Sequence, residues 1–319
     1  MNRRVVHVTA PSRLHFGMLS INRAGGRQFG GAGAMIATPG LKMTIRVADR
    51  FEVAGLLADR TERIVRLLGG DNGPPGCRID ILQAPREHVG LGTGTQLSMA
   101  VVAGLNALTG APPLDAAELA RRVGRGERSA IGLYGFIHGG LLFERGKTGD
   151  EEISPLAGRE DLPDEWRFVL ICPRRLTGLY GEAEREAFAV LPPVPEVRCA
   201  TLERMAREQL LPAAARADFA GFSEALYEFG YQAGLSFAAR QGGPFAGQRL
   251  TSLVALVRTL GIRGVGQSSW GPTLFALCPS QAGAEELIAR LVRSTDTEDL
   301  DLTISPPDNK GARIEIAAG

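Results

Sequence analysis

Hydrophobic residues in this chain follow two different spacings, which together predict a mixture of strands and helices. Apolar residues at every second position, or in short continuous runs, are typical of strands, and such segments cover 4–10, 41–48, 76–84, 166–173 and 312–317. Apolar residues three and four positions apart predict helices, and these cover 61–70, 97–108, 116–123, 200–241, 252–260 and 281–292. Residues 262–278 are typical of two strands joined by a glycine-serine turn. The mixture predicts an α+β protein.

Glycine-rich and polar segments divide this pattern. Residues 25–36 are rich in glycine and predict a loop. Residues 124–144 predict a basic loop followed by a glycine-studded strand. Residues 145–165 are polar and contain two prolines, which is typical of a linker. We therefore expect an N-terminal domain over 1–165 and a C-terminal domain over 166–319, whose tail alternates helices and strands on one sheet.

Composition excludes several classes of protein. The 36 Lys and Arg residues balance 35 Asp and Glu residues, so no overall basic field steers the chain to nucleic acid or to a membrane. The four cysteines are far apart without a CxxC pair, which argues against a zinc site or a disulfide framework and fits a reducing compartment. No apolar stretch approaches the roughly 20 residues that span a bilayer. We expect a soluble cytoplasmic protein with a local anion site.

The clearest candidate for such a site is the turn that precedes the helix at 97–108. Gly90, Gly92 and Gly94 alternate there with other residues and lead directly into the helix. A turn of this kind offers unpaired backbone N–H groups and the positive end of the helix dipole to an anion. The expected ligand is a phosphate or diphosphate; the alternative is an ordinary turn capped by Thr93 or Thr95.

Four further positions combine polar chemistry with a suggestive place in the pattern. Arg13 and His15 lie two apart on a strand and therefore project to the same side. Arg128 lies in the basic loop, and an exposed Trp270 lies at the tip of the predicted hairpin. Each also has a purely structural interpretation: a surface arginine, a core histidine, a cation at a helix C-terminus and a packed turn tryptophan.

Three glycine-rich segments resemble one known superfamily. Residues 10–17 (APSRLHFG), 90–100 (GLGTGTQLSMA) and 264–277 (GVGQSSWGPTLFAL) resemble the three motif regions of the GHMP kinases. The resemblance implies a two-domain α+β fold, in which an N-terminal α/β domain carries the phosphate loop and a ferredoxin-like α+β domain follows.

One departure from the kinases points to a different reaction. The stretch RSAIG resembles the region that holds the kinases' catalytic aspartate, yet Ser129 or Ala130 stands at that position, and a serine cannot replace this base. Segments 12–17, 88–97, 128–140 and 266–273 resemble more closely the β-ribofuranosylaminobenzene 5′-phosphate synthase branch of the superfamily. That resemblance implies condensation of phosphoribosyl diphosphate with 4-aminobenzoate or a close benzoate. Carbon dioxide and diphosphate are lost, in the biosynthesis of tetrahydromethanopterin.

This interpretation assigns roles to the candidate residues. Arg13, His15, Arg128 and Ser129 are the expected catalytic residues, the two arginines holding the 5′-phosphate or the carboxylate. Backbone N–H groups at the loop should hold the diphosphate with Mg²⁺, whose protein ligands the sequence does not identify. The expected substrate-binding residues are His88, Gly90, Gly92, Thr93, Gly94, Thr95, Gln96, Gln267, Ser268, Ser269 and Trp270.

Two alternatives stay open at this point. The first is an ATP-dependent small-molecule kinase on the same scaffold, which the missing aspartate argues against. The second is a catalytically inactive, ligand-binding relative, which the presence of Arg13, His15 and Arg128 argues against. In every case the expected partners are small molecules and not nucleic acid or membrane. A homodimer is the assembly we name, although the sequence does not determine it.

Overall fold

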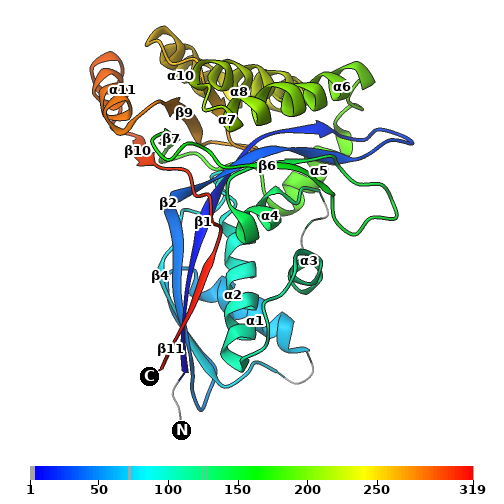
Figure 1. Cartoon of the computed structure of the whole chain (residues 1–319), viewed down its shortest axis with the longest axis vertical. Coiled ribbons are helices and arrows are strands. Elements are labelled where there is room, and N and C mark those ends of the chain that lie inside the picture. The colour runs from blue at the N-terminus through cyan, green and yellow to red at the C-terminus, as the bar shows by residue number, and fades with distance from the viewer. Residues whose placement is uncertain (1–3, 71–72, 125, 127, 319) are drawn as a thin grey trace.

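The computed structural model describes residues 4–70, 73–124, 126 and 128–318, and its elements form two sheets with helices packed against them (Figure 1). The first sheet is built on two long antiparallel strands, β1 (Arg4–Ser20) and β2 (Phe29–Val47). Its strand order is β11-β1-β2-β4-β3, with β5 and β6 branching from β2. The remaining strands are β3 (Glu52–Gly55), β4 (Cys77–Gln83), β5 (Leu141–Glu144), β6 (Leu156–Glu160) and β11 (Arg313–Ala318).

The glycine-rich segment at 25–36 is not the predicted loop over most of its length. Strand β2 begins at Phe29 and runs straight through the glycines. A Cβ atom at Gly33 would lie 2.4 Å from the carbonyl oxygen of Leu14, and one at Gly31 would lie 2.3 Å from that of Gly17. The glycines therefore allow β1 and β2 to approach closely within a sheet. The sequence pattern does not distinguish this use of glycine from its use in a flexible loop.

Four helices from the first half of the chain lie beside this sheet (Figure 1). They are α1 (Ala58–Gly69), α2 (Thr93–Thr109), α3 (Ala116–Val123) and α4 (Ile131–His138). Helix α2 buries Leu97 and Val101 against the sheet, as their spacing predicts. The Asp115 side chain accepts a hydrogen bond from the Glu118 N–H and caps α3, which covers the predicted residues 116–123.

Helix α4 corrects a second prediction, because residues 131–138 form a helix and not a glycine-studded strand. Gly135 lets this helix approach the sheet, since a Cβ atom there would lie 2.2 Å from the sulfur of Met35. The predicted strand is present only at β5, which follows helix α4.

The second sheet has the order β10-β7-β9-β8 and is antiparallel throughout. Its strands are β7 (Arg167–Pro173), β8 (Val265–Gln267), β9 (Leu274–Cys278) and β10 (Leu300–Ser305). The helices of this half are α5 (Gly181–Val190), α6 (Glu196–Met205), α7 (Leu211–Ala215), α8 (Phe219–Gly234), α9 (Ala238–Gln241), α10 (Gly247–Thr259) and α11 (Gln281–Ser294). A π-helical segment (Ala206–Leu210) and a 3₁₀ segment (Leu235–Phe237) join them.

The two halves of the chain interlock. The expected boundary at 165 falls between β6 and β7, and so between the two sheets, but β11 crosses back and pairs with β1. The expectation that the tail stays on one sheet is therefore wrong. The expected linker also contains β6, which pairs with β5. Leu14 and Phe16 of β1 share a core with Phe229 of α8 and Phe275 of β9, so one hydrophobic cluster joins both sheets.

The structure also bears on membranes and cysteines. None of the helices in the described part of the chain combines the length and the apolar character that crossing a membrane requires. All four cysteines are buried and unbridged, as the absence of paired spacing predicts.

Candidate active site

The three glycine-rich motifs meet at one place. The Ser268 hydroxyl donates to the Gly90 carbonyl oxygen (2.6 Å) and accepts from the His15 backbone N–H (3.0 Å). The Arg13 N–H donates to the Leu91 carbonyl oxygen at 2.9 Å. Gly90 has a φ of +91°, and a Cβ atom there would lie 2.3 Å from the Ser268 carbonyl oxygen. Only glycine fits this junction, which brings together segments far apart in the sequence.

The glycine loop leads into helix α2 without a side-chain cap. Gly92 is the N-cap, with a φ of +73°, and its carbonyl oxygen accepts from the N–H groups of Thr95 and Gln96, both at 3.0 Å. The capping alternative, Thr93 or Thr95, is therefore wrong. The N–H groups of Thr93 and Gly94 lie in the first turn, where no helical carbonyl precedes them, so they are available to an anion.

The threonine hydroxyls of this loop differ in what they contact. The Thr93 hydroxyl donates to the Arg86 carbonyl oxygen (2.9 Å), and its side chain is buried. It therefore holds the loop together, whereas Thr95 lies on the wall of the adjacent cleft. Gln96 is also structural here, because its amide donates to the Gly132 carbonyl oxygen (2.9 Å) and ties α2 to α4.

A cleft of about 830 Å³ opens in front of the loop, and cationic side chains dominate its wall. The charged residues on the wall are Arg13, Arg60, Arg63, Arg128, Arg185 and Glu184. Arg60 lies directly on the loop, since a Cβ atom at Gly94 would lie 2.1 Å from its Nη2 atom, and it pairs with Glu87. Gly94 thus makes room for a guanidinium. Arg60, Arg63 and Arg185 lie on helices α1 and α5 without a local motif, so the sequence alone does not mark them as site residues.

His88 contributes to the rim of the same cleft. Its imidazole stacks on Tyr180, with the ring centroids 3.6 Å apart. Its carbonyl oxygen accepts from the Gly178 N–H at 2.7 Å. The coil between β7 and α5 therefore lies beside the glycine loop.

Arg128 occupies the boundary between this cleft and an aromatic pocket. Its guanidinium pairs with Glu184 (3.0 Å) and lies over the Phe188 ring, 4.6 Å from the centroid. Two partners from helix α5 therefore hold it, so compensation of a helix terminus does not explain its place. Both Glu184 and Phe188 lie far from Arg128 in the sequence and were not candidates.

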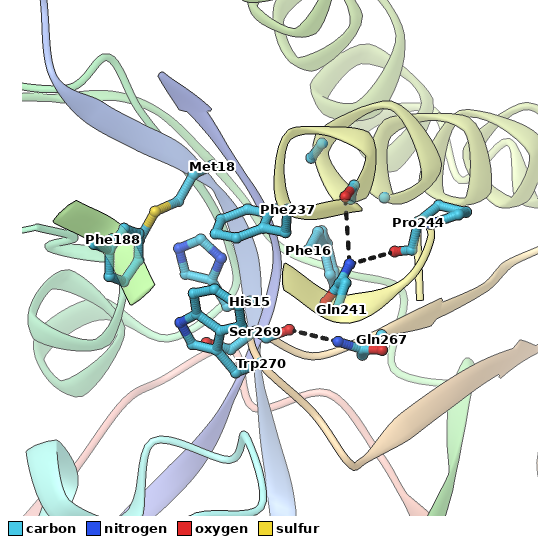
Figure 2. Close-up of a pocket in the computed structure, with 14 residues that line it drawn as sticks. His15, Phe16, Met18, Phe188, Phe237, Gln241, Pro244, Gln267, Ser269 and Trp270 are labelled. Carbon is cyan, nitrogen blue, oxygen red and sulfur yellow. Dashed lines mark hydrogen bonds between the residues drawn. The ribbon is translucent and has the colours of Figure 1, made fainter. Parts of the chain in front are cut away.

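The aromatic pocket is a cavity of about 40 Å³ that adjoins the cleft (Figure 2). Trp270 packs edge-on against Phe188 and Phe237, with ring centroids 5.4 Å and 4.8 Å apart. It is only 9% exposed, so the expectation of an exposed tryptophan is wrong. His15, Met18, Ser269 and Trp270 line both the pocket and the cleft, which therefore meet at these four residues.

The other polar residues of the hairpin tip hold it in place. The Gln267 side-chain oxygen accepts from the Ala246 N–H (2.7 Å), and its amide nitrogen donates to the Ser269 carbonyl oxygen (3.0 Å; Figure 2). Ser268 is fully buried in the contacts described above. Of the predicted binding residues, Ser268 and Gln96 line neither cavity, whereas Gln267 lines the aromatic pocket.

Behind His15 lies a buried chain of hydrogen bonds. The His15 Nε2 atom lies 3.1 Å from the Ser129 hydroxyl, which donates to a carboxylate oxygen of Glu144 at 2.7 Å. The second carboxylate oxygen accepts from the Ala130 N–H at 2.8 Å. Glu144 is fully buried and was not a candidate; the only signal was a lone acid closing the apolar run LLFE.

Burial determines the protonation states of His15 and Glu144, the two ends of this hydrogen-bonded path. It lowers the pKa of His15 to about 3, and the charge of Arg13 acts in the same direction, so His15 is neutral near pH 7. Burial also raises the pKa of Glu144 to about 7, although hydrogen bonds from Ser129 and Ala130 oppose the rise. A carboxyl that titrates near neutrality is suited to accept and return a proton.

No group of three His, Cys, Asp or Glu side chains is placed to hold a metal ion in the described ranges. Mg²⁺ commonly binds through one or two carboxylates together with substrate phosphates. Glu184 on the cleft wall is a carboxylate of that kind, already paired with Arg128. Glu184 would therefore supply the carboxylate of such a magnesium site if a ligand with phosphate groups occupied the cleft.

Comparisons with known proteins agree with this geometry. Residues 56–140 match the family model for the GHMP kinases N terminal domain. The homoserine kinase of Cytophaga hutchinsonii superposes with a TM-score of 0.65 at 17% identity, over 98% of this chain and 97% of that chain. The mevalonate-3-kinase of Thermoplasma acidophilum gives 0.65 at 12% identity, over 99% of both. Residues 56–140 are thus similar to the GHMP kinases N terminal domain, and the chain has the α+β fold of these kinases, as the three motifs indicated.

Its relatives in sequence carry a different name from these kinases. The β-ribofuranosylphenol 5′-phosphate synthase of Archaeoglobus fulgidus is 28% identical over 325 aligned residues, which cover 98% of this chain and all of that protein. The protein of the same name from Methanothermobacter thermautotrophicus is 26% identical, over 86% of this chain and 89% of that protein.

Proposed function

We propose that this protein is a decarboxylating pentosyltransferase. It joins the ribose carbon of phosphoribosyl diphosphate to the ring of a para-substituted benzoate, releasing diphosphate and carbon dioxide. The observation that carries the proposal is the junction at His15, where an arginine-lined cleft at a helix N-terminus meets an aromatic pocket. The full-length likeness to synthases of that name supports it.

The cleft suits a substrate that carries both a diphosphate and a separate phosphate group. The N–H groups of Thr93 and Gly94 and the nearby Arg60 would hold the diphosphate, whose negative charge grows as it leaves the anomeric carbon. Arg13 and Arg128 would bind the 5′-phosphate or the acceptor carboxylate, because a planar guanidinium fits both. Mg²⁺ would enter with the diphosphate and share its charge.

The aromatic end suits the acceptor. Trp270, Phe188 and Phe237 offer apolar ring surfaces next to His15, so an acceptor ring at the junction would face the cleft. The pocket of about 40 Å³ is smaller than a benzoate, so the ring must sit partly in the larger cleft or displace side chains.

The para substituent of the acceptor must donate electrons to the ring, and both an amino and a hydroxyl group do so. The sequence resemblance implied 4-aminobenzoate, whereas the relatives' name contains a phenol, which corresponds to 4-hydroxybenzoate. We propose that the enzyme acts on one of these two acceptors. The product is a C-riboside that we place in tetrahydromethanopterin biosynthesis.

The test is an incubation with phosphoribosyl diphosphate, Mg²⁺ and each acceptor labelled in its carboxyl group. Labelled carbon dioxide and diphosphate should appear in equal amounts, and only when both substrates are present. An incubation with ATP in place of phosphoribosyl diphosphate is the control for the kinase alternative. ATP turnover without carbon dioxide would contradict the proposal.

A further inference from the structure

The carboxylate missing from the position of the kinase aspartate is supplied by another element. Ser129 stands at that position, and Glu144, at the end of β5, lies behind it with its carboxylate 2.7 Å from the Ser129 hydroxyl. His15 from β1 lies on the other side of the serine, at 3.1 Å. Three elements thus build one continuous path from a buried acid to the junction of the two cavities.

The order of groups along this path excludes a nucleophilic triad. In a triad the carboxylate orients the histidine, which in turn activates the serine. Here the serine lies between the histidine and the carboxylate. When Glu144 is ionised, the single hydroxyl proton of Ser129 points to its carboxylate, so the His15 Nε2 atom carries the proton that the serine oxygen accepts. This assignment leaves Nδ1 as the basic nitrogen of His15.

We propose that Glu144, Ser129 and His15 form a proton relay for the para substituent of the acceptor, a role that rests on the proposed function. As the ring carbon bonds to the ribose, the bond to diphosphate breaks and its electron pair leaves with diphosphate. The acceptor hydroxyl proton passes to His15 Nδ1, and the Nε2 proton passes through Ser129 to Glu144. Loss of carbon dioxide returns an electron pair to the ring, and the proton returns to the oxygen by the same path.

In this scheme His15 is the catalytic residue and the other two act through it. Glu144 can take up a proton because burial disfavours its charged form, and it can return that proton because its pKa lies near 7. The groups that face Glu144 are Arg13 and His15 from β1, Tyr134 from α4, and Ser129 and Ser154 from the adjoining loops. Of these, Arg13 carries a fixed charge that favours the carboxylate.

The relay matters more for a hydroxyl acceptor than for an amino acceptor. Attack by a phenol ring leaves a protonated carbonyl, which is a strong acid and must lose its proton as the bond forms. Attack by an aniline ring leaves an iminium group, which tolerates its positive charge far better. The relay therefore favours 4-hydroxybenzoate over 4-aminobenzoate as the acceptor.

The experiment compares kcat for the two acceptors in the wild type, Glu144→Gln and Ser129→Ala. Glutamine keeps the size of the carboxylate and one of its two acceptor oxygens but cannot take up the proton, and alanine breaks the path while keeping Glu144. Each variant should lose about a hundredfold in kcat with 4-hydroxybenzoate and less than about tenfold with 4-aminobenzoate. The KM for phosphoribosyl diphosphate should not change.

A pH profile adds a readout that a purely structural role would not move. In the wild type, kcat with 4-hydroxybenzoate should rise with pH through about 7 as Glu144 ionises. His15, with a pKa of about 3, stays neutral across this range. Glu144→Gln should abolish the rise, and Glu160→Gln on the neighbouring strand β6 should leave both kcat and its profile unchanged.

The outcomes separate the relay from the proposed function. If the wild type releases no carbon dioxide with either acceptor, the proposed function is wrong. If the wild type is active but the variants lose the same factor with both acceptors, or keep the rise near pH 7, the relay is wrong. The Ser129→Ala variant decides the matter if Glu144→Gln does not fold.

Discussion

The two cavities that meet at His15 are built in opposite ways. Glycines and arginines line the open wall of the cleft, beside the first backbone N–H groups of helix α2. The aromatic pocket and the relay behind it consist of buried rings and a buried acid. The likeness to kinases at 12–17% identity extends over nearly the whole chain, so the fold is common to different reactions. Under the proposed function, the backbone loop supplies a general phosphate site, and the side chains that face it determine the reaction.

The largest effect should come from the buried acid and appear in stability. The folded protein holds the pKa of Glu144 near 7 instead of 4.5, so between these values it binds the proton that the unfolded chain releases. The free energy of unfolding therefore falls as the pH rises through this window. Glu144→Gln cannot bind this proton, so its free energy of unfolding should not fall in this window. Relative to the wild type, the variant should become more stable by on the order of 3 kcal/mol between pH 4.5 and 7.

Urea unfolding of both proteins at several pH values measures this gain. His15 has the opposite effect on the pH dependence. Folding lowers its pKa from 6.5 to about 3, so its contribution to the free energy of unfolding is lost as the pH falls below 6.5. Subtracting the wild-type curve from the variant curve removes that contribution. A difference that does not change with pH would show that Glu144 is not held as a buried acid.

The next effect concerns the cleft. Gly92→Val should lower the affinity for phosphoribosyl diphosphate about tenfold to a hundredfold, because a side chain here meets Arg13 and disturbs the helix N-terminus. Its φ of +73° also adds strain, which costs about 1–2 kcal/mol of stability. Isothermal titration measures the affinity and thermal unfolding the strain.

Gly110→Val is the matched control for that variant. Gly110 ends the same helix with a φ of +81°, so it carries a similar backbone strain far from the cleft. It should lose comparable stability and keep the affinity. Equal affinities in the two variants would mean that the loop is an ordinary turn and that the anion binds elsewhere.

The smallest effect should come from the aromatic pocket. Phe237→Leu removes an edge-on contact with Trp270, of the kind worth about 0.5–1.5 kcal/mol, so the KM for the acceptor should rise roughly threefold to tenfold. The KM for phosphoribosyl diphosphate should stay the same. Phe222→Leu, in the core shared by the two sheets, should lower stability without changing either KM. A change in the KM for phosphoribosyl diphosphate alone would reverse our assignment of the two cavities.

The sequence by itself determined the features that depend on neighbours in the chain. Helix α2 follows from the spacing of Leu97 and Val101, helix α3 from the pattern at 116–123, and the common direction of Arg13 and His15 from strand alternation. The glycine motifs also sufficed to indicate the likeness to the GHMP kinases N terminal domain, whose family model matches residues 56–140. These properties need only a few consecutive residues, so a linear pattern carries them.

The tertiary structure alone decided what depends on residues distant in sequence. His15 and Ser129 are 114 positions apart, and Arg128 and Glu184 are 56 apart, so no local spacing brings them together. The glycines of β2 and α4 were misjudged because flexibility and close packing use the same residue. Trp270 is buried only because Phe188 and Phe237 arrive from α5 and from the 3₁₀ segment after α8. From the sequence, Ser129 indicated only that the kinases' catalytic aspartate is missing. The fold adds the relay, because β5 places the Glu144 carboxylate next to the Ser129 hydroxyl.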